Sequence, residues 1–274
     1  MEEFELFWPT GEIAVATTVL RIVLAILTAA LIGYAFQRVG RRHASRQQRT
    51  DRMESQENFL VSGVLVLLAL MLAFTTSFVV ERYDQRRLLV IEEANAIGTA
   101  YLRSQALDEP HRTRLSNLLV EYADNRIALG SATGDRRGLL AKNDALLTDI
   151  WAAVLAANDS AREKGISTPF YLAFNQVVDF DTERKAARLS RVPEGVLVTL
   201  YVFLVVTAGI LGAVLDGARQ RIVAAILFML LILAVAMIVD LNRPTRGTIR
   251  ESQQALLLLR DSMKVPRSAY DRFK

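Results

Sequence analysis

Long runs of uncharged, mostly apolar residues alternate with charged segments along the chain. Residues 59–80, 195–215 and 222–239 contain no charged side chain, over 22, 21 and 18 residues. A helix of about 20 apolar residues crosses the hydrocarbon core of a bilayer. A fourth apolar run, at residues 13–36, is interrupted only by Arg21. We therefore predict four transmembrane helices, grouped two and two, at residues 13–36, 59–80, 195–215 and 222–240.

Arg21 lies near one end of the first predicted span. A long arginine side chain in that position can reach the lipid headgroups while its methylene groups stay in hydrocarbon. The alternative is an inward-facing Arg21 that pairs with an anion or with an acidic residue.

The connections between the predicted spans are rich in arginine. Lysine and arginine in short loops remain on the cytoplasmic side of a membrane. The loop at 37–58 and the short turn at 216–221 are therefore predicted inside a bacterial inner membrane, where the loop would contact anionic lipids. The segments at 1–12, 81–193 and 241–274 are then predicted outside. The arginines concerned are Arg38, Arg41, Arg42, Arg46, Arg49, Arg52, Arg219 and Arg221.

The middle segment, residues 81–193, shows no alternation typical of strands and is predicted to be helical throughout. No proline or glycine separates the second span from Ile97, so one helix is predicted from about residue 58 to residue 106. Further helices are expected after Pro110, around 139–154, from Ser167, and near 256–259 in the tail. The predicted fold is all-α, with four transmembrane helices in a 2+2 arrangement around an extramembrane helical domain into which the second span continues.

Composition excludes several classes of function. The chain has no cysteine and a net charge of +4, so disulfides, thiol catalysis and cysteine-ligated metals are ruled out, and nucleic-acid binding has no support. The two histidines, His43 and His111, do not follow a glutamate at the spacing that a di-iron bundle uses. No phosphate-binding loop, dinucleotide fingerprint or nucleophile elbow occurs. We therefore predict no enzyme, no cofactor and no metal.

The second span contains three consecutive hydroxyl residues between two phenylalanines. One interpretation is that each hydroxyl bonds to the backbone carbonyl one turn earlier. The other is that these residues line a water-filled path with a phenyl constriction. The candidate pore-lining residues are Phe74, Thr75, Thr76, Ser77 and Phe78.

A second polar group follows the same span and contains Glu92, Glu93 and Asn95. We favour a polar network that fixes the register of neighbouring helices over an ion or metal site. Gly98 lies among alanines, and small residues allow close packing between helices. We also hypothesise that Arg243 or Arg246 clamps Glu92 or Glu93, because guanidinium and carboxylate groups bond in pairs.

Three stretches resemble the bestrophin-like family of bacterial membrane proteins: Val79 to Arg87, Glu92 to Arg103, and Asp240 to Gly247 followed by Ser252 and Gln253. The resemblance implies a relation to bestrophins, which are pentameric anion channels with four spans per subunit and a second span that lines a hydrophobic neck. Phe74 and Phe78 would then be neck residues. Two features differ from bestrophins: the helical domain is predicted outside, and no acidic calcium-binding cluster is present.

Two functions remain open. The first is a homo-oligomeric ion channel, a pentamer by analogy, that passes inorganic anions through a pore lined by the second span. The second is a non-catalytic membrane scaffold or sensor whose helical domain binds a partner protein.

Overall fold

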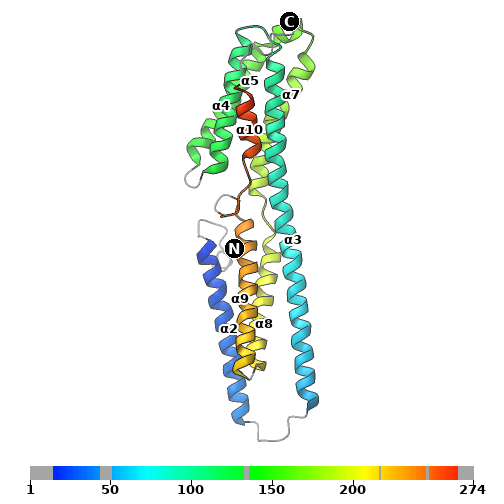
Figure 1. Ribbon diagram of the computed structural model, residues 1–274, viewed down its shortest axis with the longest axis vertical. Coiled ribbons are helices and arrows are strands. Elements are labelled where there is room, and N and C mark those ends of the chain that lie inside the picture. The colour runs from blue at the N-terminus through cyan, green and yellow to red at the C-terminus, as the bar shows by residue number, and fades with distance from the viewer. Residues whose placement is uncertain (1–14, 44–50, 133–135, 216, 245–246, 265–274) are drawn as a thin grey trace. The chain divides into compact units, whose positions relative to one another are not determined.

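The computed structural model describes residues 15–43, 51–132, 136–215, 217–244 and 247–264. All regular elements in these residues are α-helices (Figure 1), which confirms the predicted all-α class. In chain order they are α2 (Val15–His43), α3 (Asp51–Ser104), α4 (His111–Ser131), α5 (Arg137–Ala156), α6 (Asn158–Glu163), α7 (Ser167–Leu189), α8 (Glu194–Val214), α9 (Ala218–Leu241) and α10 (Gln254–Ser262).

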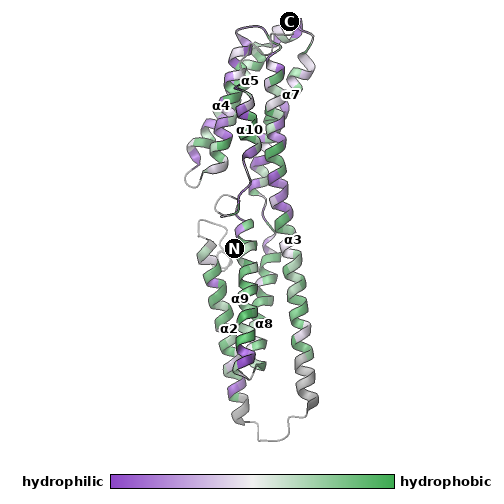
Figure 2. Ribbon diagram, in the orientation of Figure 1, coloured by the Kyte–Doolittle hydropathy of each residue, from purple (hydrophilic) through white to green (hydrophobic). Residues whose placement is uncertain are grey.

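Four stretches of helix are long and apolar enough to cross a membrane, as predicted. They include α2, the first part of α3, α8 and α9, which are coloured hydrophobic over most of their described length in Figure 2. These helices make the chain a multi-pass membrane protein. The helix α3 is continuous over 54 residues, and the short helix α6 was not predicted.

The chain divides into two compact units. The first, which we call the apolar unit, contains residues 1–82 and 191–249, and the second, which we call the charged unit, contains residues 83–190 and 250–274. The helix α3 contributes to both units, because the boundary lies between Arg82 and Tyr83.

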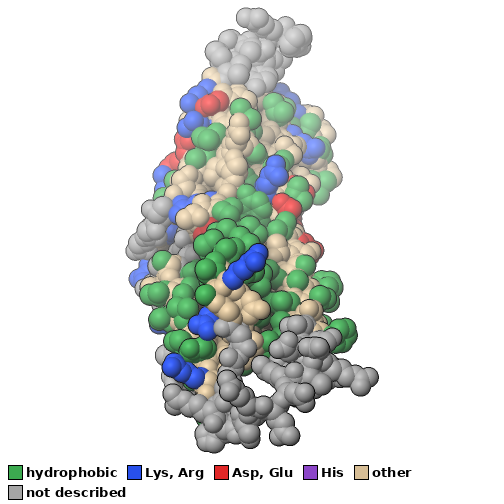
Figure 3. Space-filling model, turned by 60° about the horizontal axis from the view of Figure 1, so that its bottom comes forward, with side chains coloured by type: hydrophobic (Ala, Val, Ile, Leu, Met, Phe, Trp, Pro, Cys, Tyr) green, Lys and Arg blue, Asp and Glu red, His purple; other side chains and the backbone are tan. Residues whose placement is uncertain are grey.

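In the apolar unit, small residues bring α2 and α8 into backbone contact. A Cβ atom at Gly33 would overlap the carbonyl oxygen of Gly209, and one at Gly212 would overlap that of Ala30. Close approach through glycine and alanine is how helices associate where lipid removes the hydrophobic driving force. Large apolar side chains point outward instead, and Figure 3 shows a broad hydrophobic surface with scattered Lys and Arg side chains.

The charged unit has an ordinary apolar core. Its largest buried side chains include Phe170 and Phe174 of α7, whose ring centroids lie 4.9 Å apart, and Ile97 of α3. Helices α4, α5 and α10 contribute Leu119, Ile150 and Leu256 to the same cluster. This core positions a set of charged side chains that lie inside the unit rather than on its surface.

Candidate functional site

The predicted pore-lining residues of α3 lie on two sides of the helix. Phe74 and Phe78 are 55% and 48% exposed, and Ser77 between them is also exposed. Thr75 is fully buried, and its hydroxyl donates to the carbonyl oxygen of Met71 over 2.8 Å. The hydroxyl of Thr76 donates to Leu72 in the same way, over 2.8 Å. Both threonines therefore bond one turn back, whereas Ser77 shares a face with the two phenylalanines.

Among the residues that the structure describes, the charged group with the least exposure is the carboxylate of Glu93 in α3, which has no exposed surface. One of its oxygens lies 2.7 Å from Nε of Arg126 and forms an ion pair with it, although the two groups are not aligned for a hydrogen bond. The same oxygen accepts a hydrogen bond of 3.2 Å from the hydroxyl of Tyr122. The other oxygen accepts from Nη1 of Arg184. Glu93 thus joins α3 to α4 and α7 through two guanidinium groups.

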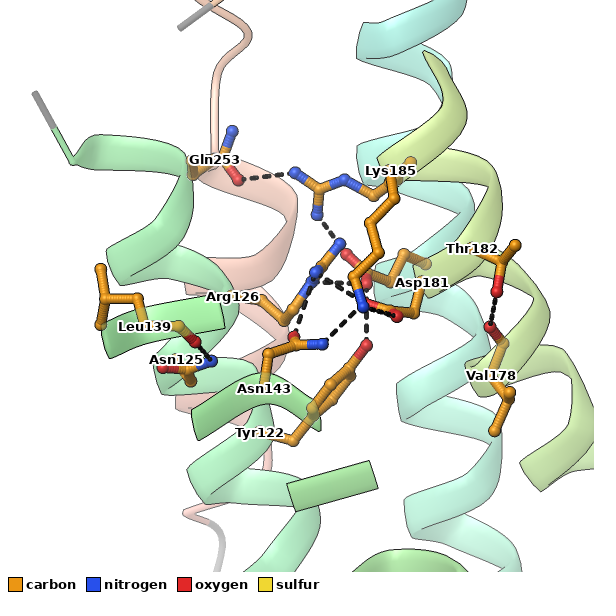
Figure 4. A network of polar contacts seen from close by, with 12 residues as sticks. Tyr122, Asn125, Arg126, Leu139, Asn143, Val178, Asp181, Thr182, Lys185 and Gln253 are labelled. Atoms are coloured by element: carbon orange, nitrogen blue, oxygen red, sulfur yellow. Dashed lines mark hydrogen bonds and ion pairs between the residues drawn. The ribbon is translucent and has the colours of Figure 1, made fainter. Parts of the chain in front are cut away.

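A second carboxylate completes this network from α7. Oδ1 of Asp181 accepts from Nη1 of Arg126 over 2.8 Å and from the amide of Asn143 over 2.9 Å. Arg126 also donates to Asn143 over 3.1 Å. The other oxygen of Asp181 lies 2.8 Å from Lys185 (Figure 4), which reaches toward the surface and pairs with Asp144.

The protonation of these groups follows from their burial and charge. Burial, together with the negative charge of Glu93, raises the pKa of Tyr122 well above its usual value, so its hydroxyl stays a donor. Burial alone would lower the pKa of Arg126, but the combined attraction of Glu93, Tyr122 and Asp181 outweighs it and raises that pKa. Arg126 therefore remains a cation inside the unit.

A neighbouring ion pair fixes the segment before α10. Nε of Arg86 donates to Glu251 over 2.6 Å, and both side chains are buried. The amide oxygen of Gln253 accepts from Arg184 over 3.4 Å, and a Cβ at Gly130 would overlap the Gln253 side chain. The segment is thus tied to α3, α4 and α7 within the charged unit.

The other predicted residues near Glu93 are placed differently. Glu92 and Asn95 lie on the exposed face of α3. A Cβ at Gly98 would lie 3.0 Å from a methyl group of Leu259 in α10, so Gly98 faces a side chain rather than a helix backbone. In the part of the chain that the structure describes, no group of three or more His, Asp or Glu side chains could hold a metal ion.

The stretch after α9 forms a turn closed by Asp240. Its carboxylate accepts from the amide of Thr248, the hydroxyl of Thr248 and the amide of Ile249, over 2.7, 2.7 and 2.9 Å. Arg243 donates to the buried hydroxyl of Thr18 in α2 over 2.9 Å. Arg246 lies outside the described residues, and the clamp between these arginines and Glu92 or Glu93 stays a prediction.

Sequence reasoning singled out Glu93 but missed its partners. In α4 the buried positions include Leu115, Leu119, Tyr122, Arg126 and Leu129, and in α7 they include Phe170, Phe174, Val177, Asp181 and Arg184. Each charged residue therefore continues the apolar stripe of its helix at a spacing of three or four residues. A charge on the apolar face of a helix is the signal that could have found the network.

A network of this kind locks helices together. Removing one partner of a buried ion pair leaves an uncompensated charge and costs about 3–5 kcal/mol. Its carboxylates are fully engaged by guanidinium, amide and phenol groups. The network places fixed positive charges inside the unit. Its ion pairs and hydrogen bonds determine how α3, α4, α5 and α7 pack together.

The family model of the Bestrophin-like domain matches residues 23–256. No curated protein and no solved structure matches the chain. The matched residues contain the exposed face of α3 and the whole Glu93 network, and they cover most of the sequence. The chain therefore belongs to the bestrophin-like family, as its sequence motifs predicted.

Proposed function

We propose that the chain is one subunit of a homo-oligomeric ion channel in which α3 of each copy lines the pore. The observation that supports this best is the outward face of α3 in a single copy. Phe74, Ser77 and Phe78 are exposed there, whereas Leu68, Thr75 and Val79 are buried on the other side. A ring of hydroxyl and phenyl groups is a type of surface from which pores and hydrophobic constrictions are built.

Anions are the proposed permeant ions. Residues 59–80 contain no Asp or Glu, and rings of these side chains are what cation channels use for selectivity. Membership of the bestrophin-like family supports the same choice, through the relation of that family by name to bestrophin anion channels. The number of five copies rests on that relation alone.

The decisive experiment is ion flux through the purified protein in liposomes. We expect chloride and nitrate to pass, and we expect Phe74→Ala combined with Phe78→Ala to increase the flux because the constriction widens. Phe59→Ala is the matched control, since Phe59 lies in the same helix and is 78% exposed. Absence of flux in the unaltered protein, together with a sealed or lipid-filled axis, would reject the channel.

The proposed orientation places the basic 37–58 loop and the 216–221 turn in the bacterial cytoplasm, in contact with anionic lipids, and the charged unit outside. The chain has no cysteine, so one introduced thiol reports its own side of the membrane. Ala145→Cys in α5 should react with an impermeant maleimide in intact cells, and Ala218→Cys at the start of α9 only after permeabilisation. Both positions are exposed, and the reverse pattern would overturn the orientation.

A second function has one observation in its favour. A hollow of about 450 Å³ lies on the charged unit between α5 and α7, lined by Leu147, Thr148, Trp151, Asn175, Val178 and Asp179. Such a hollow beside an aromatic side chain suits a non-catalytic scaffold or sensor that binds a partner protein. A stable partner that is lost on Trp151→Ala, in a protein without ion flux, would favour this function over the channel.

A further inference from the structure

Positive charge is in excess around the Glu93 network. The carboxylates inside the cluster are each engaged: Glu93 by Arg126 and Arg184, Asp181 by Arg126 and Lys185, and Glu251 by Arg86 at 2.6 Å. Two further arginines, Arg136 and Arg188, are close enough to repel this group. Neither makes an ion pair with a carboxylate among the residues that the structure describes.

The environment of these two arginines is unfavourable for a cation. Burial, followed by repulsion from Arg184 and Arg136, lowers the pKa of Arg188 to about 9. Burial and repulsion from Arg126 and Arg184 also lower the pKa of Arg136, whose Nε is buried without a hydrogen-bond acceptor in the described part of the chain. Both arginines are half-buried, a charge without a counter-charge is costly in such a place, and the nearby carboxylate of Glu251 is already held by Arg86.

A small cavity lies next to the guanidinium group of Arg188. Its lining consists of Arg86, Leu89, Arg184, Ala187, Arg188 and Glu251. The centre of a water-sized sphere can move through about 10 Å³ of this space, so the cavity admits one water molecule or a monatomic ion somewhat larger than water. A polyatomic organic anion is too large for it. With three guanidinium groups and one carboxylate in the lining, a small anion is favoured over a neutral molecule.

We propose that this cavity binds one monatomic anion of the size of chloride, between Arg188, Arg184 and Arg86. The anion would supply the missing negative charge and join α3 to α7 beside the segment before α10. It would bind inside the charged unit, so the proposal does not depend on ion conduction. A ligand that binds only the folded state stabilises it according to its concentration, so the stability of the charged unit should depend on chloride.

The test is thermal unfolding of the full-length protein in detergent, with chloride exchanged for gluconate at constant ionic strength. Gluconate is too large for the cavity. We expect chloride and bromide to raise the Tm by about 2–4 °C with saturation, and sulfate to act like gluconate. Line broadening of the chloride nuclear magnetic resonance signal, reversed by bromide, should report the same site in the unaltered protein.

Two variants separate this site from general salt effects. Arg188→Gln should abolish the chloride-dependent rise in Tm. Arg87→Gln should retain this rise, because Arg87 follows Arg86 in α3 but has an exposed side chain. Equal Tm in chloride and gluconate, an equal rise in sulfate, or a full chloride response in Arg188→Gln would each overturn the proposal. If Arg188→Gln does not fold, line broadening that bromide fails to reverse in the unaltered protein would overturn it.

Discussion

The helices of the two units place their large apolar side chains in opposite ways, outward in one unit and inward in the other. In the apolar unit, large side chains such as Phe36, Leu31 and Leu233 are 80%, 66% and 68% exposed, while glycines bring the helix backbones together. In the charged unit, Phe170 and Phe174 are fully buried, and so is the carboxylate of Glu93. The difference is the one expected between lipid and water as surroundings, because lipid accepts apolar side chains on the outside of a protein whereas water favours their burial.

The comparison also explains where each unit gains its specificity. Apolar packing alone tolerates many arrangements of helices, whereas a buried charge tolerates only the arrangement that pairs it. The apolar unit restricts its packing through steric contact at Gly33 and Gly212. The charged unit restricts it through ion pairs from Glu93 to two other helices.

The largest expected effect is loss of the central carboxylate. Glu93→Ala leaves Arg126 and Arg184 without their shared partner, and should lower the free energy of unfolding by about 3–5 kcal/mol. Unfolding of the protein by guanidinium chloride, followed by circular dichroism, measures this loss. The control is its neighbour, Glu92→Ala, whose exposed side chain should change stability by no more than about 0.5 kcal/mol. Equal effects of the two changes would refute the role given to Glu93.

The next effect tests the steric rule of the apolar unit. Gly33→Ala forces a methyl group against the backbone of α8, and should destabilise the protein by about 1–3 kcal/mol. Gly63→Ala in α3 meets no atom within 4 Å, and should stabilise by up to about 1 kcal/mol. The same unfolding measurement compares them, and a harmless Gly33→Ala would show that α2 and α8 do not pack in this way.

A smaller effect is expected at Thr75, which is buried in α3. Its hydroxyl bonds to the helix backbone at Met71, so Thr75→Val removes one internal bond without leaving a partner side chain unpaired. The expected loss is below about 1 kcal/mol, with ion flux unchanged. A large loss of flux would instead place the Thr75 hydroxyl in the path of the ions.

The smallest effect is expected at an exposed ion pair of the charged unit. Lys142 lies 2.8 Å from Glu121, and both side chains are about half exposed. Lys142→Gln should therefore lower the free energy of unfolding by no more than about 0.5 kcal/mol, because water and salt screen such pairs. A loss as large as that of Glu93→Ala would show that burial is not what distinguishes the Glu93 network.

Sequence patterns predicted the helices well because lipid and water impose simple rules on composition. The uncharged run at 195–215 corresponds to α8 (Glu194–Val214), and Ser167 begins α7 as expected. Arg191 and Pro193 lie in the break between these two helices. The short α6 was missed because its six residues carry no apolar period.

The partners of Glu93 could not be read from the sequence in the same way. Arg184 is 91 residues away and Asp181 is 55 residues from Arg126, so their contacts depend on how four helices meet. Charged residues on a helix are expected in water, and only their position in the apolar stripe marks Arg126 and Asp181 as buried.

The most direct test of the central claim is a cryo-electron microscopy reconstruction of the purified complex at a resolution that shows side chains. The proposal predicts a closed ring of identical subunits, with Phe74, Ser77 and Phe78 of every copy facing a continuous central path. A monomer, or a ring in which these three side chains face the surrounding lipid, would contradict it.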